Sequence, residues 1–250
     1  MNNTKVSIIT ITYNSAKTLE NTLRSVQAQT FRNIEHIIID GVSTDGTTDL
    51  IERYRHQLAV VVSEPDNGIY DAINKGLRLA TGDIIGILNS DDVLADPTTI
   101  ETIVRKLEET DADIAYGDLL YCTDTSKLDT VVRYWRSNIF RPKELRWGWM
   151  PPHPTLYIRR EAYLAVGEYD TQFRISADYD FILRLFSQNY RSVYIPNVLV
   201  KMTTGGVSNR NLRMICRKSS EDLRALRKNH IGGLYSLIMK NVRKAYQFFR

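Results

Sequence analysis

The sequence lacks the features that mark several large classes of protein. Its 250 residues include only two cysteines, Cys122 and Cys216, whose spacing suits neither a metal site nor a redox motif, so we expect reduced thiols. No stretch approaches the ~18 consecutive apolar residues of a membrane-spanning helix. The first residues, MNNTKVSIITITYNS, have neither the basic stretch nor the cleavage site of a signal peptide. These absences predict a cytoplasmic protein.

Several nucleotide-binding signatures are also missing. The segment after the first predicted strand, TYNSAKT, has no glycine-rich turn, which disfavours a nicotinamide dehydrogenase. A Walker loop is absent, as is the glycine- and arginine-rich loop that nucleotidyltransferases carry at this position. Residues 1–208 hold 22 Lys/Arg and 27 Asp/Glu, and no aromatic-basic motif of a nucleic-acid reader is present. We therefore expect no nucleic-acid partner, although residues 209–250, with 11 Lys/Arg and 2 Asp/Glu, lend one slight support.

What the sequence does contain is an alternation of strand and helix patterns over about residues 1–110. Four apolar runs predict strands: KVSIITIT, IEHIIID, LAVVVSE and DIIGILN. The segments between and after them predict helices at about 15–29, 47–57, 68–80 and 97–109. This pattern is typical of an α/β fold with a mostly parallel sheet flanked by helices.

The pattern loosens from residue 113 to about 205, where strands and one helix, SADYDFILRLFSQ, remain recognisable. Residues 209–230 and 233–249 predict two basic amphipathic helices. We therefore predict one domain over residues 1–208, with halves of about 1–110 and 111–208, followed by a helical tail over 209–250.

Polar residues follow each strand of the first half. These residues are Thr12, Tyr13, Asn14, Asp40, Ser43, Asp66, Asp71, Asp91 and Asp92. In an open α/β sheet, ligands bind beyond the carboxyl ends of the strands, so we expect these side chains to converge on one rim. Each motif alone also suits an ordinary turn or a helix N-cap. Together, however, the acids would repel one another, and a Mg²⁺ or Mn²⁺ ion bound to a ligand diphosphate would resolve that repulsion.

Four blocks of the sequence then carry a resemblance. They are VSIITITYNSAKTLENTLRSVQAQTFRNIEHIIIDGVSTDGT, EPDNGIYDAINKGLRLATGDIIGILNSDD, HPTLYIRREAYLAVGEYD and SADYDFILRL. In order and spacing they resemble the inverting family 2 glycosyltransferases of the GT-A (Rossmann-like) fold, especially bacterial enzymes of surface polysaccharide synthesis. The resemblance implies transfer of a hexosyl or N-acetylhexosaminyl group from a nucleotide sugar, with UDP favoured. The implied acceptor is a glycan or a polyprenyl-diphosphate-linked sugar.

The resemblance also implies roles for the rim residues. Residues equivalent to Thr12, Tyr13, Asn14 and Asp40 hold the base and ribose, and a carboxylate at Asp40 can accept the N3–H of uracil. The metal motif falls on Asn89-Ser90-Asp91-Asp92, where Asn89 replaces the first acid. We favour Asp92 as the direct metal ligand and Asp91 as a contact to the ribose or the donor sugar. Asp91 is also a candidate metal ligand. Ser43, Asp66, Asp71 and Lys75 are placed beside the donor, although Asp71 and Lys75 also suit an ordinary helix pair.

The catalytic block of the family falls on Ala177-Asp178-Tyr179-Asp180. An inverting transfer needs a carboxylate to take the proton of the acceptor hydroxyl. The resemblance gives that role to Asp178, with Asp180 as second choice, while the plainer alternatives are a helix N-cap and a charge that favours the helix dipole. Further candidates are Trp147 and Trp149 for stacking on the acceptor sugar and His153 for the diphosphate or metal. A loop at Gly205-Gly206 is a candidate for closing over the donor.

The two predicted tail helices have apolar faces. One holds Leu212, Ile215, Cys216, Leu223 and Leu226, and the other Leu234, Leu237, Ile238, Val242, Ala245 and Phe249. We expect the first helix to pack on the body. The second is basic and suits either the interface of the cytoplasmic membrane at its inner face or a docked helix, with a homodimer contact as a further option. The alternative function is a non-catalytic protein that binds a sugar nucleotide or nucleic acid. Substitution of Asp178 distinguishes the two: an enzyme would lose turnover and keep its nucleotide affinity, whereas a binding protein has no turnover to lose.

Overall fold

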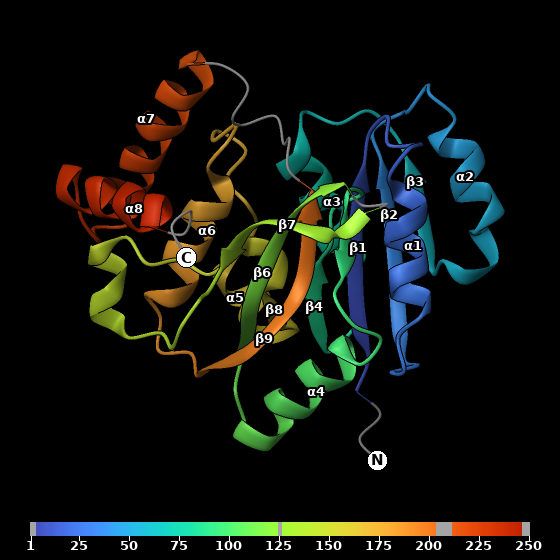
Figure 1. The fold of residues 1–250 in the computed structure, drawn as a ribbon, viewed down its shortest axis with the longest axis horizontal. Helices are drawn as coiled ribbons and strands as arrows, with labels where there is room; N and C mark the ends of the chain where they lie inside the picture. Colours follow the sequence, from blue (N-terminus) through green and yellow to red (C-terminus); the bar gives the residue numbers. More distant parts are fainter. Residues whose placement is uncertain (1–3, 125–126, 204–211, 247–250) are drawn as a thin grey trace.

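A computed structural model describes residues 4–124, 127–203 and 212–246 (Figure 1). The strands form one mixed sheet in the order β3-β2-β1-β4-β8-β6-β9-β5, and β7 pairs with β6 off this path. Helices cover the sheet, and the two C-terminal helices lie at one end of the molecule, beside α6. The predicted α/β class and the C-terminal helical extension are confirmed.

The first half of the chain forms a parallel sheet with β1 at its centre. β1 pairs in parallel with β2 and β4, and β2 pairs in parallel with β3. Every residue of β1 and β4 is buried, as expected for strands covered on both faces. The strands of this half are β1 (Val6–Thr12), β2 (Ile34–Asp40), β3 (Val60–Ser63) and β4 (Ile84–Ile87). The helices are α1 (Leu19–Gln27), α2 (Thr47–Arg53), α3 (Ile69–Leu79) and α4 (Thr99–Thr110).

The second half is mixed, so the predicted mostly parallel arrangement is correct for the first half only. β8 runs antiparallel to both β4 and β6, whereas β9 is parallel to β6 and antiparallel to β5. β5 and β8 have three residues each, which is too short for a period to be visible in the sequence. The strands are β5 (Asp92–Leu94), β6 (Ile114–Asp124), β7 (Lys127–Trp135), β8 (Tyr157–Arg159) and β9 (Ser192–Thr203).

Two helices and three short 3₁₀ turns complete the body. α1 begins at Leu19, later than predicted, because Asn14 adopts a left-handed backbone (φ 50°) and the chain turns at Ser15 before the helix starts. The helices are α5 (Arg160–Val166) and α6 (Ala177–Phe186), and the 3₁₀ turns are η1 (Arg55–Gln57), η2 (Pro142–Trp147) and η3 (His153–Thr155).

The C-terminal helices are α7 (Leu212–Lys228) and α8 (Leu234–Tyr246). α7 packs on α6 and buries Ala225 and Leu226 in the main core, in accord with the prediction for the first tail helix. α8 buries Leu237 in the same core. Its Leu234, Ile238 and Val242 remain more than half exposed, so the predicted apolar face is split between core and solvent. No helix in the described part of the chain is both long and apolar enough to cross a membrane.

Candidate active site

The loops after β1, β2 and β4 are joined by hydrogen bonds. The backbone N–H of Asn14 donates to the Ser43 hydroxyl (2.8 Å), and the Asn14 side-chain oxygen accepts from the Thr44 N–H (2.8 Å). The hydroxyls of Ser15 and Ser90 lie 2.8 Å apart, which links the first loop to the NSDD segment. The predicted convergence of these strand ends on one rim is therefore present in the fold.

The β2 loop also contains a strained residue. Val42 is β-branched and adopts a left-handed backbone with φ 63°, a conformation that such residues rarely occupy. Its side chain is 45% exposed, so core packing does not account for the strain. Strain of this kind is concentrated in segments that bind ligands, and this turn lies on the rim described above.

Gly41 brings the second and third loops together. A Cβ atom at this position would lie 2.6 Å from Asp66 Oδ2 and 3.3 Å from the Tyr13 ring, so only glycine permits this approach. The other oxygen of Asp66 accepts the backbone N–H of Gly68 (2.8 Å), which fixes the carboxylate. Tyr13 is largely exposed beside it. A carboxylate and an aromatic face thus flank the same short segment.

Asp40 occupies a different environment from Asp66. It is fully buried, and its oxygens accept hydrogen bonds from the hydroxyls of Ser43 (2.5 Å) and Ser63 (2.6 Å) and from the Ser43 N–H (3.1 Å). The expected contact between Asp40 and a uracil N3–H does not fit this arrangement, because the carboxylate already shapes the turn after β2. Thr12 is also buried, and its hydroxyl has no partner among the described residues.

Asp71 and Lys75 hold the loop that carries Asp66. The Lys75 ammonium binds the Pro65 carbonyl (2.6 Å) and the Glu64 carboxylate (2.9 Å). Asp71 accepts the backbone N–H of Asn67 (2.9 Å) and lies 4.0 Å from Lys75. Both residues are therefore beside the rim, as predicted, but their described contacts are to the protein's own loop.

Asp91 and Asp92 differ sharply in burial. Asp92 is fully buried, accepts a hydrogen bond from the Asn89 amide (2.8 Å), and has one oxygen without a partner among the described residues. Burial, reinforced by the neighbouring Asp91 charge, raises the pKa of Asp92 well above its usual range. Asp91 is less enclosed, and burial raises its pKa as well.

A divalent cation fits this pair of carboxylates. It would coordinate the buried Asp92 carboxylate oxygen that has no hydrogen-bond partner among the described residues, and it would remove the repulsion between the two acids. Within residues 4–124, 127–203 and 212–246, no three His, Cys, Asp or Glu side chains are grouped to hold a metal, so His153 does not join the pair. The remaining ligands would come from a bound phosphate group and water, as is usual for Mg²⁺.

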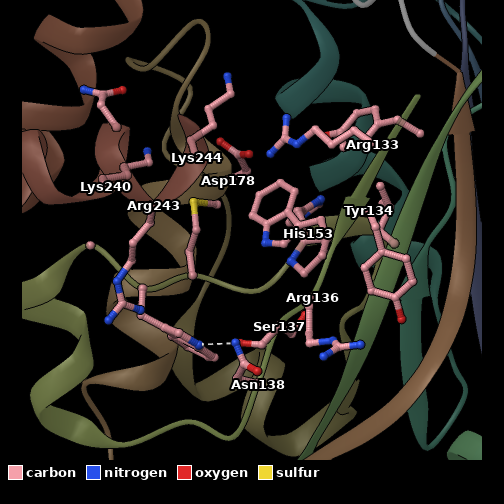
Figure 2. Close-up of a pocket in the computed structure, with 18 of the residues that line it drawn as sticks. Arg133, Tyr134, Arg136, Ser137, Asn138, His153, Asp178, Lys240, Arg243 and Lys244 are labelled. Atoms are coloured by element: carbon pink, nitrogen blue, oxygen red, sulfur yellow. Dashed lines mark hydrogen bonds between the residues drawn. The ribbon is translucent and has the colours of Figure 1, made fainter. Parts of the chain in front are cut away.

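Asp178 lies in the first turn of α6 and faces a large pocket (Figure 2). One carboxylate oxygen accepts the Tyr179 N–H (2.8 Å) and the Tyr70 hydroxyl (3.2 Å). The other oxygen has no hydrogen-bond partner among the described residues, so it is available to a ligand. The backbone just before α6 is fixed by Glu221 of α7, which accepts the N–H groups of Ile175 (2.8 Å) and Ser176 (3.1 Å).

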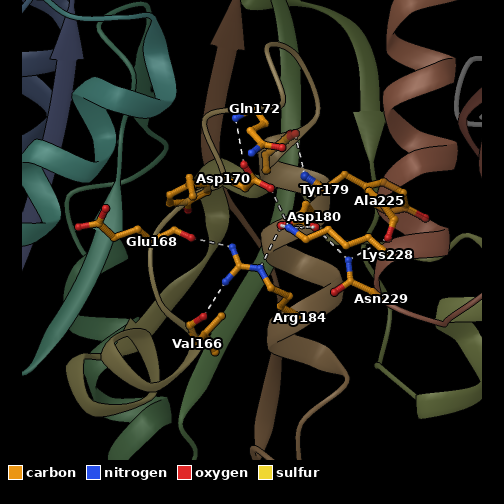
Figure 3. Close-up of polar contacts among 12 residues, drawn as sticks. Val166, Glu168, Asp170, Gln172, Tyr179, Asp180, Arg184, Ala225, Lys228 and Asn229 are labelled. Carbon is orange, nitrogen blue, oxygen red and sulfur yellow. Dashed lines mark hydrogen bonds and ion pairs between the residues drawn. The ribbon is translucent and has the colours of Figure 1, made fainter.

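Asp180, two residues further on, is fully buried and lies in a network of ion pairs and hydrogen bonds (Figure 3). Arg184 (3.0 Å) and Asn229 (2.9 Å) donate to its carboxylate, and Lys228 pairs with it at 3.1 Å. Its charge therefore joins α6 to α7. This placement does not fit the second-choice role of proton acceptor, because no described oxygen of Asp180 faces the pocket.

The pocket in front of Asp178 has a volume of about 1500 Å³ and lies between β6, β7, η2 and helices α6 to α8. His153 lines it and shares a hydrogen bond of 2.7 Å with the Tyr169 hydroxyl. Burial lowers the pKa of His153, although the charge of Asp178 opposes that shift. Such a volume exceeds the usual range for one drug-sized ligand and leaves room for a sugar and a neighbouring group.

The two tryptophans are placed differently from the prediction. Trp149 is only 4% exposed, packs against Phe140 and Phe186, and donates its indole N–H to the Ser137 carbonyl (2.8 Å). Trp147 is 45% exposed but contacts Tyr235 outside the large pocket. Trp149 therefore contributes core packing and part of the pocket wall, and Trp147 lies outside the pocket that Asp178 faces. The candidate loop at Gly205-Gly206 falls outside the described residues.

The pocket also contains basic residues of α7 and α8 that sequence reasoning missed. Lys240 pairs with Asp222 (2.8 Å) and lies over the Tyr179 ring, while Arg243 pairs with Glu144. Lys218 and Lys244 line the same pocket without an ion pair among the described residues. The sequence showed these charges only as the polar face of a tail, because their position depends on how the helices dock.

The comparisons with known proteins agree with this architecture. Residues 7–166 match the model of the family described as glycosyl transferase family 2. A "PGL/p-HBAD biosynthesis glycosyltransferase" of Mycobacterium tuberculosis is 30% identical over 220 residues, covering 81% of this chain and 78% of that protein. A second M. tuberculosis glycosyltransferase is 33% identical over 206 residues, covering 81% and 76%.

Solved structures share the fold at lower identity. Staphylococcus aureus TarS superimposes with a TM-score of 0.66 at 20% identity, covering 89% of this chain and 43% of the TarS chain. TarS 1–349 in complex with UDP gives 0.69 at 18% identity, covering 97% and 70%. A Pyrobaculum calidifontis mannosyltransferase in complex with GDP-Man and Mn²⁺ gives 0.66 at 22% identity, covering 98% and 69%.

Proposed function

The chain belongs to glycosyl transferase family 2, and from this premise we propose that it transfers a sugar from a nucleoside-diphosphate sugar to an acceptor hydroxyl with inversion. The observation that carries this proposal is the position of Asp178. Its carboxylate has one oxygen without a described partner and faces a pocket large enough for an acceptor.

Asp178 is the proposed general base. The acceptor hydroxyl attacks the anomeric carbon from the face opposite the diphosphate and gives its proton to the Asp178 carboxylate. As the new C–O bond forms, the bond from the anomeric carbon to the phosphate oxygen breaks, and its electron pair leaves with the nucleoside diphosphate. Tyr70 and the Tyr179 N–H hold the other oxygen, and thus orient the carboxylate.

We assign the donor to the rim of the first half. Asp66 and Tyr13 flank Gly41, where a carboxylate and an exposed ring suit a base, and we favour uracil. The UDP complex of TarS, which has the same fold, supports this choice. Asp91 and Asp92 would hold Mg²⁺ or Mn²⁺, which when bound neutralises charge on the leaving diphosphate. The Mn²⁺ in the Pyrobaculum structure supports a divalent cation without distinguishing the two metals.

The proposed acceptor is a glycan or a polyprenyl-diphosphate-linked sugar, and the proposed process is surface polysaccharide synthesis. The exposed Leu234, Ile238 and Val242 of α8 support peripheral contact with the inner face of the cytoplasmic membrane. The apolar stripe carries this proposed contact, because Arg243 of the same helix pairs with Glu144 and Lys244 lines the pocket. A homodimer through the same face is the competing use of these side chains.

The proposal is tested by a screen of sugar nucleotides. The full chain is incubated with UDP-, GDP- and dTDP-sugars and either Mn²⁺ or Mg²⁺, with and without a mixture of glycosides as acceptors, and the released nucleoside diphosphate is measured. We expect release with at least one UDP-sugar and its loss in excess chelator. Tight donor binding without release from any sugar nucleotide, even with acceptors, would instead indicate a non-catalytic binding protein.

A further inference from the structure

The cations of the C-terminal helices face the catalytic pocket. Lys218 of α7 and Lys244 of α8 line one side, and Arg133 of β7 lies on the other, over the rings of Tyr121 (4.8 Å) and Trp135 (5.3 Å). In Figure 2, Lys244 and Arg133 extend into the pocket around Asp178. We propose that Lys218 and Lys244 form a phosphate subsite for the acceptor, with Arg133 facing them across the pocket, so that the enzyme takes acceptors whose sugar is linked to a phosphate or diphosphate.

The arrangement of charges is unfavourable without an anion. Lys240 and Arg243 each have a carboxylate partner: Lys240 pairs with Asp222 of α7, and Arg243 pairs with Glu144 of the body. Lys218 and Lys244 have none among the described residues. Burial lowers the pKa of Lys244 to about 8, with further lowering by Lys218, Arg133 and Lys240 that Asp222 only partly opposes. Like charges gathered in a partly buried pocket repel one another, and a bound phosphate would remove that repulsion.

The subsite belongs to the acceptor because of where the two helices lie. α7 and α8 pack on α6 and η2, whereas the loops assigned to the nucleotide follow β1 to β3. In Figure 1, α6, which carries Asp178, lies between these two regions. A donor phosphate would lie beside Asp91 and Asp92, on the nucleotide side of the base. An anion held by Lys218 and Lys244 would lie on the opposite side, where the attacking hydroxyl must enter.

The rim of the pocket suits a lipid attached to that phosphate. Ile139, Ile215 and Val242 line the pocket and are each about half exposed or more. Val242 continues into the exposed stripe with Ile238 and Leu234 on α8. Cationic walls inside an apolar rim match a phosphate with an alkyl chain leading out of the pocket. This inference rests on the proposed glycosyl transfer and specifies its acceptor class.

The subsite is tested by calorimetric binding of octyl diphosphate to the full chain, with saturating UDP present. Lys218→Gln and Lys244→Gln should each weaken binding roughly tenfold, because each removes a charge-assisted hydrogen bond. Lys106→Gln on α4 removes the same charge far from the pocket, so the affinity for octyl diphosphate should be unchanged in this control. UDP affinity should be the same in all three variants. Free pyrophosphate is the second probe: tighter binding of octyl diphosphate assigns a lipid-linked source, and equal binding assigns a phosphate without lipid.

Two further readouts separate a binding role from a structural one. In phosphate-free buffer, Lys244→Gln should keep or raise the melting temperature, because it relieves repulsion among Lys218, Lys240 and Arg133. Binding of octyl diphosphate should weaken as the pH rises through about 8, since Lys244 then loses its charge; Lys218, Lys240, Arg133 and the Asp222 carboxylate are the charged groups that face it.

The outcomes distinguish this inference from the proposed function. Loss of UDP affinity in Lys218→Gln or Lys244→Gln, with octyl diphosphate binding retained, would place the subsite on the donor and overturn the inference. Transfer to neutral glycosides without binding of octyl diphosphate would also overturn it and leave the proposed function intact. Binding of octyl diphosphate that depends on both lysines, with no transfer to any acceptor, would keep the subsite and reject the glycosyl transfer.

Discussion

The two walls of the active site are held together by different kinds of contact. The nucleotide wall consists of loops after neighbouring parallel strands. They are joined by hydrogen bonds in which the Asn14 N–H donates to Ser43 and the Asn14 side-chain oxygen accepts from Thr44. The acceptor wall depends on contacts that hold the C-terminal helices against the body, namely Glu221 with the backbone before α6 and Arg243 with Glu144. The first wall follows from local motifs, and the second exists only when the C-terminal helices dock.

The largest effect is expected where the walls meet. Asp178→Asn keeps the shape of the side chain but removes its ability to take a proton, so turnover should fall by roughly 10²–10⁴ with donor affinity nearly unchanged. Single-turnover rates and UDP-sugar binding measure the two quantities. Asp180→Asn is the matched comparison: it should lower the melting temperature by disturbing the buried ion pairs. Near-normal turnover in Asp178→Asn would contradict the assignment.

A change confined to the nucleotide wall should spare the acceptor. Asp91→Ala removes one carboxylate of the proposed metal pair, so activity should fall on the order of 10²-fold. Metal-dependent tightening of UDP-sugar binding should disappear, while binding of octyl diphosphate stays the same. Titrations with and without Mn²⁺ test both points. Wild-type activity that persists in excess chelator would exclude the metal role of the pair.

A change in the acceptor wall should not affect binding of the nucleotide sugar. Glu221→Gln replaces a charged acceptor of two backbone N–H groups by a neutral one, which loosens the segment just before Asp178. We expect roughly a tenfold lower turnover, which corresponds to a loss of about 1–1.5 kcal/mol in transition-state stabilisation. The KM for the donor should be unchanged. Steady-state kinetics well below the melting temperature distinguish this from unfolding. A raised donor KM with normal turnover would refute the positioning role.

A smaller effect is expected within the donor slot. Gly41→Ala would put a methyl group 2.6 Å from Asp66 Oδ2, so the carboxylate must move. We expect the donor KM to rise roughly fivefold, which corresponds to a loss of about 1 kcal/mol in donor binding free energy. The acceptor KM should not change. Gly233→Ala, where no heavy atom lies within 4 Å of the added Cβ, is the control. Equal kinetics for the two variants would argue against Asp66 as a donor contact.

The smallest effect concerns the exposed face of α8. The double variant Ile238→Ser with Val242→Ser should bind anionic liposomes several-fold more weakly in a flotation assay, because it removes apolar area from the proposed membrane contact. Leu164→Ser, an exposed apolar residue on α5, is the control. These substitutions keep the Lys240–Asp222 pair, which deleting α8 would break. Equal flotation of all variants at low salt would reject membrane contact through α8.

The fold and the rim of the first half could be predicted because both follow from local signals. Buried apolar runs specify parallel strands, and the carboxyl ends of such strands share one edge, so the convergence of Asn14, Ser43 and Ser90 needed no long-range information. The four linked motifs also sufficed to identify the family. The short strands β5 and β8 have no period and could not be found this way.

Side-chain roles were harder to predict because burial depends on distant partners. Asp178 and Asp180 are two positions apart in one motif, and docking of Lys228 and Asn229 encloses the second but not the first. Asp40 is enclosed in the same way by Ser63 of β3, while Asp66 remains beside the open rim. Lys218, Lys244 and Glu221 had no motif at all, since their function depends on the docked position of helices that looked like a tail.

The buried network around Asp180 also bears on how the protein is made. Before α7 docks, Arg184 is the only described basic residue that can neutralise Asp180, and a poorly compensated buried carboxylate opposes close packing of α6. During synthesis on a ribosome, residues near 229 emerge after almost all of the catalytic body. The nascent chain therefore completes its nucleotide rim early and acquires the native setting of its proposed base only late in translation.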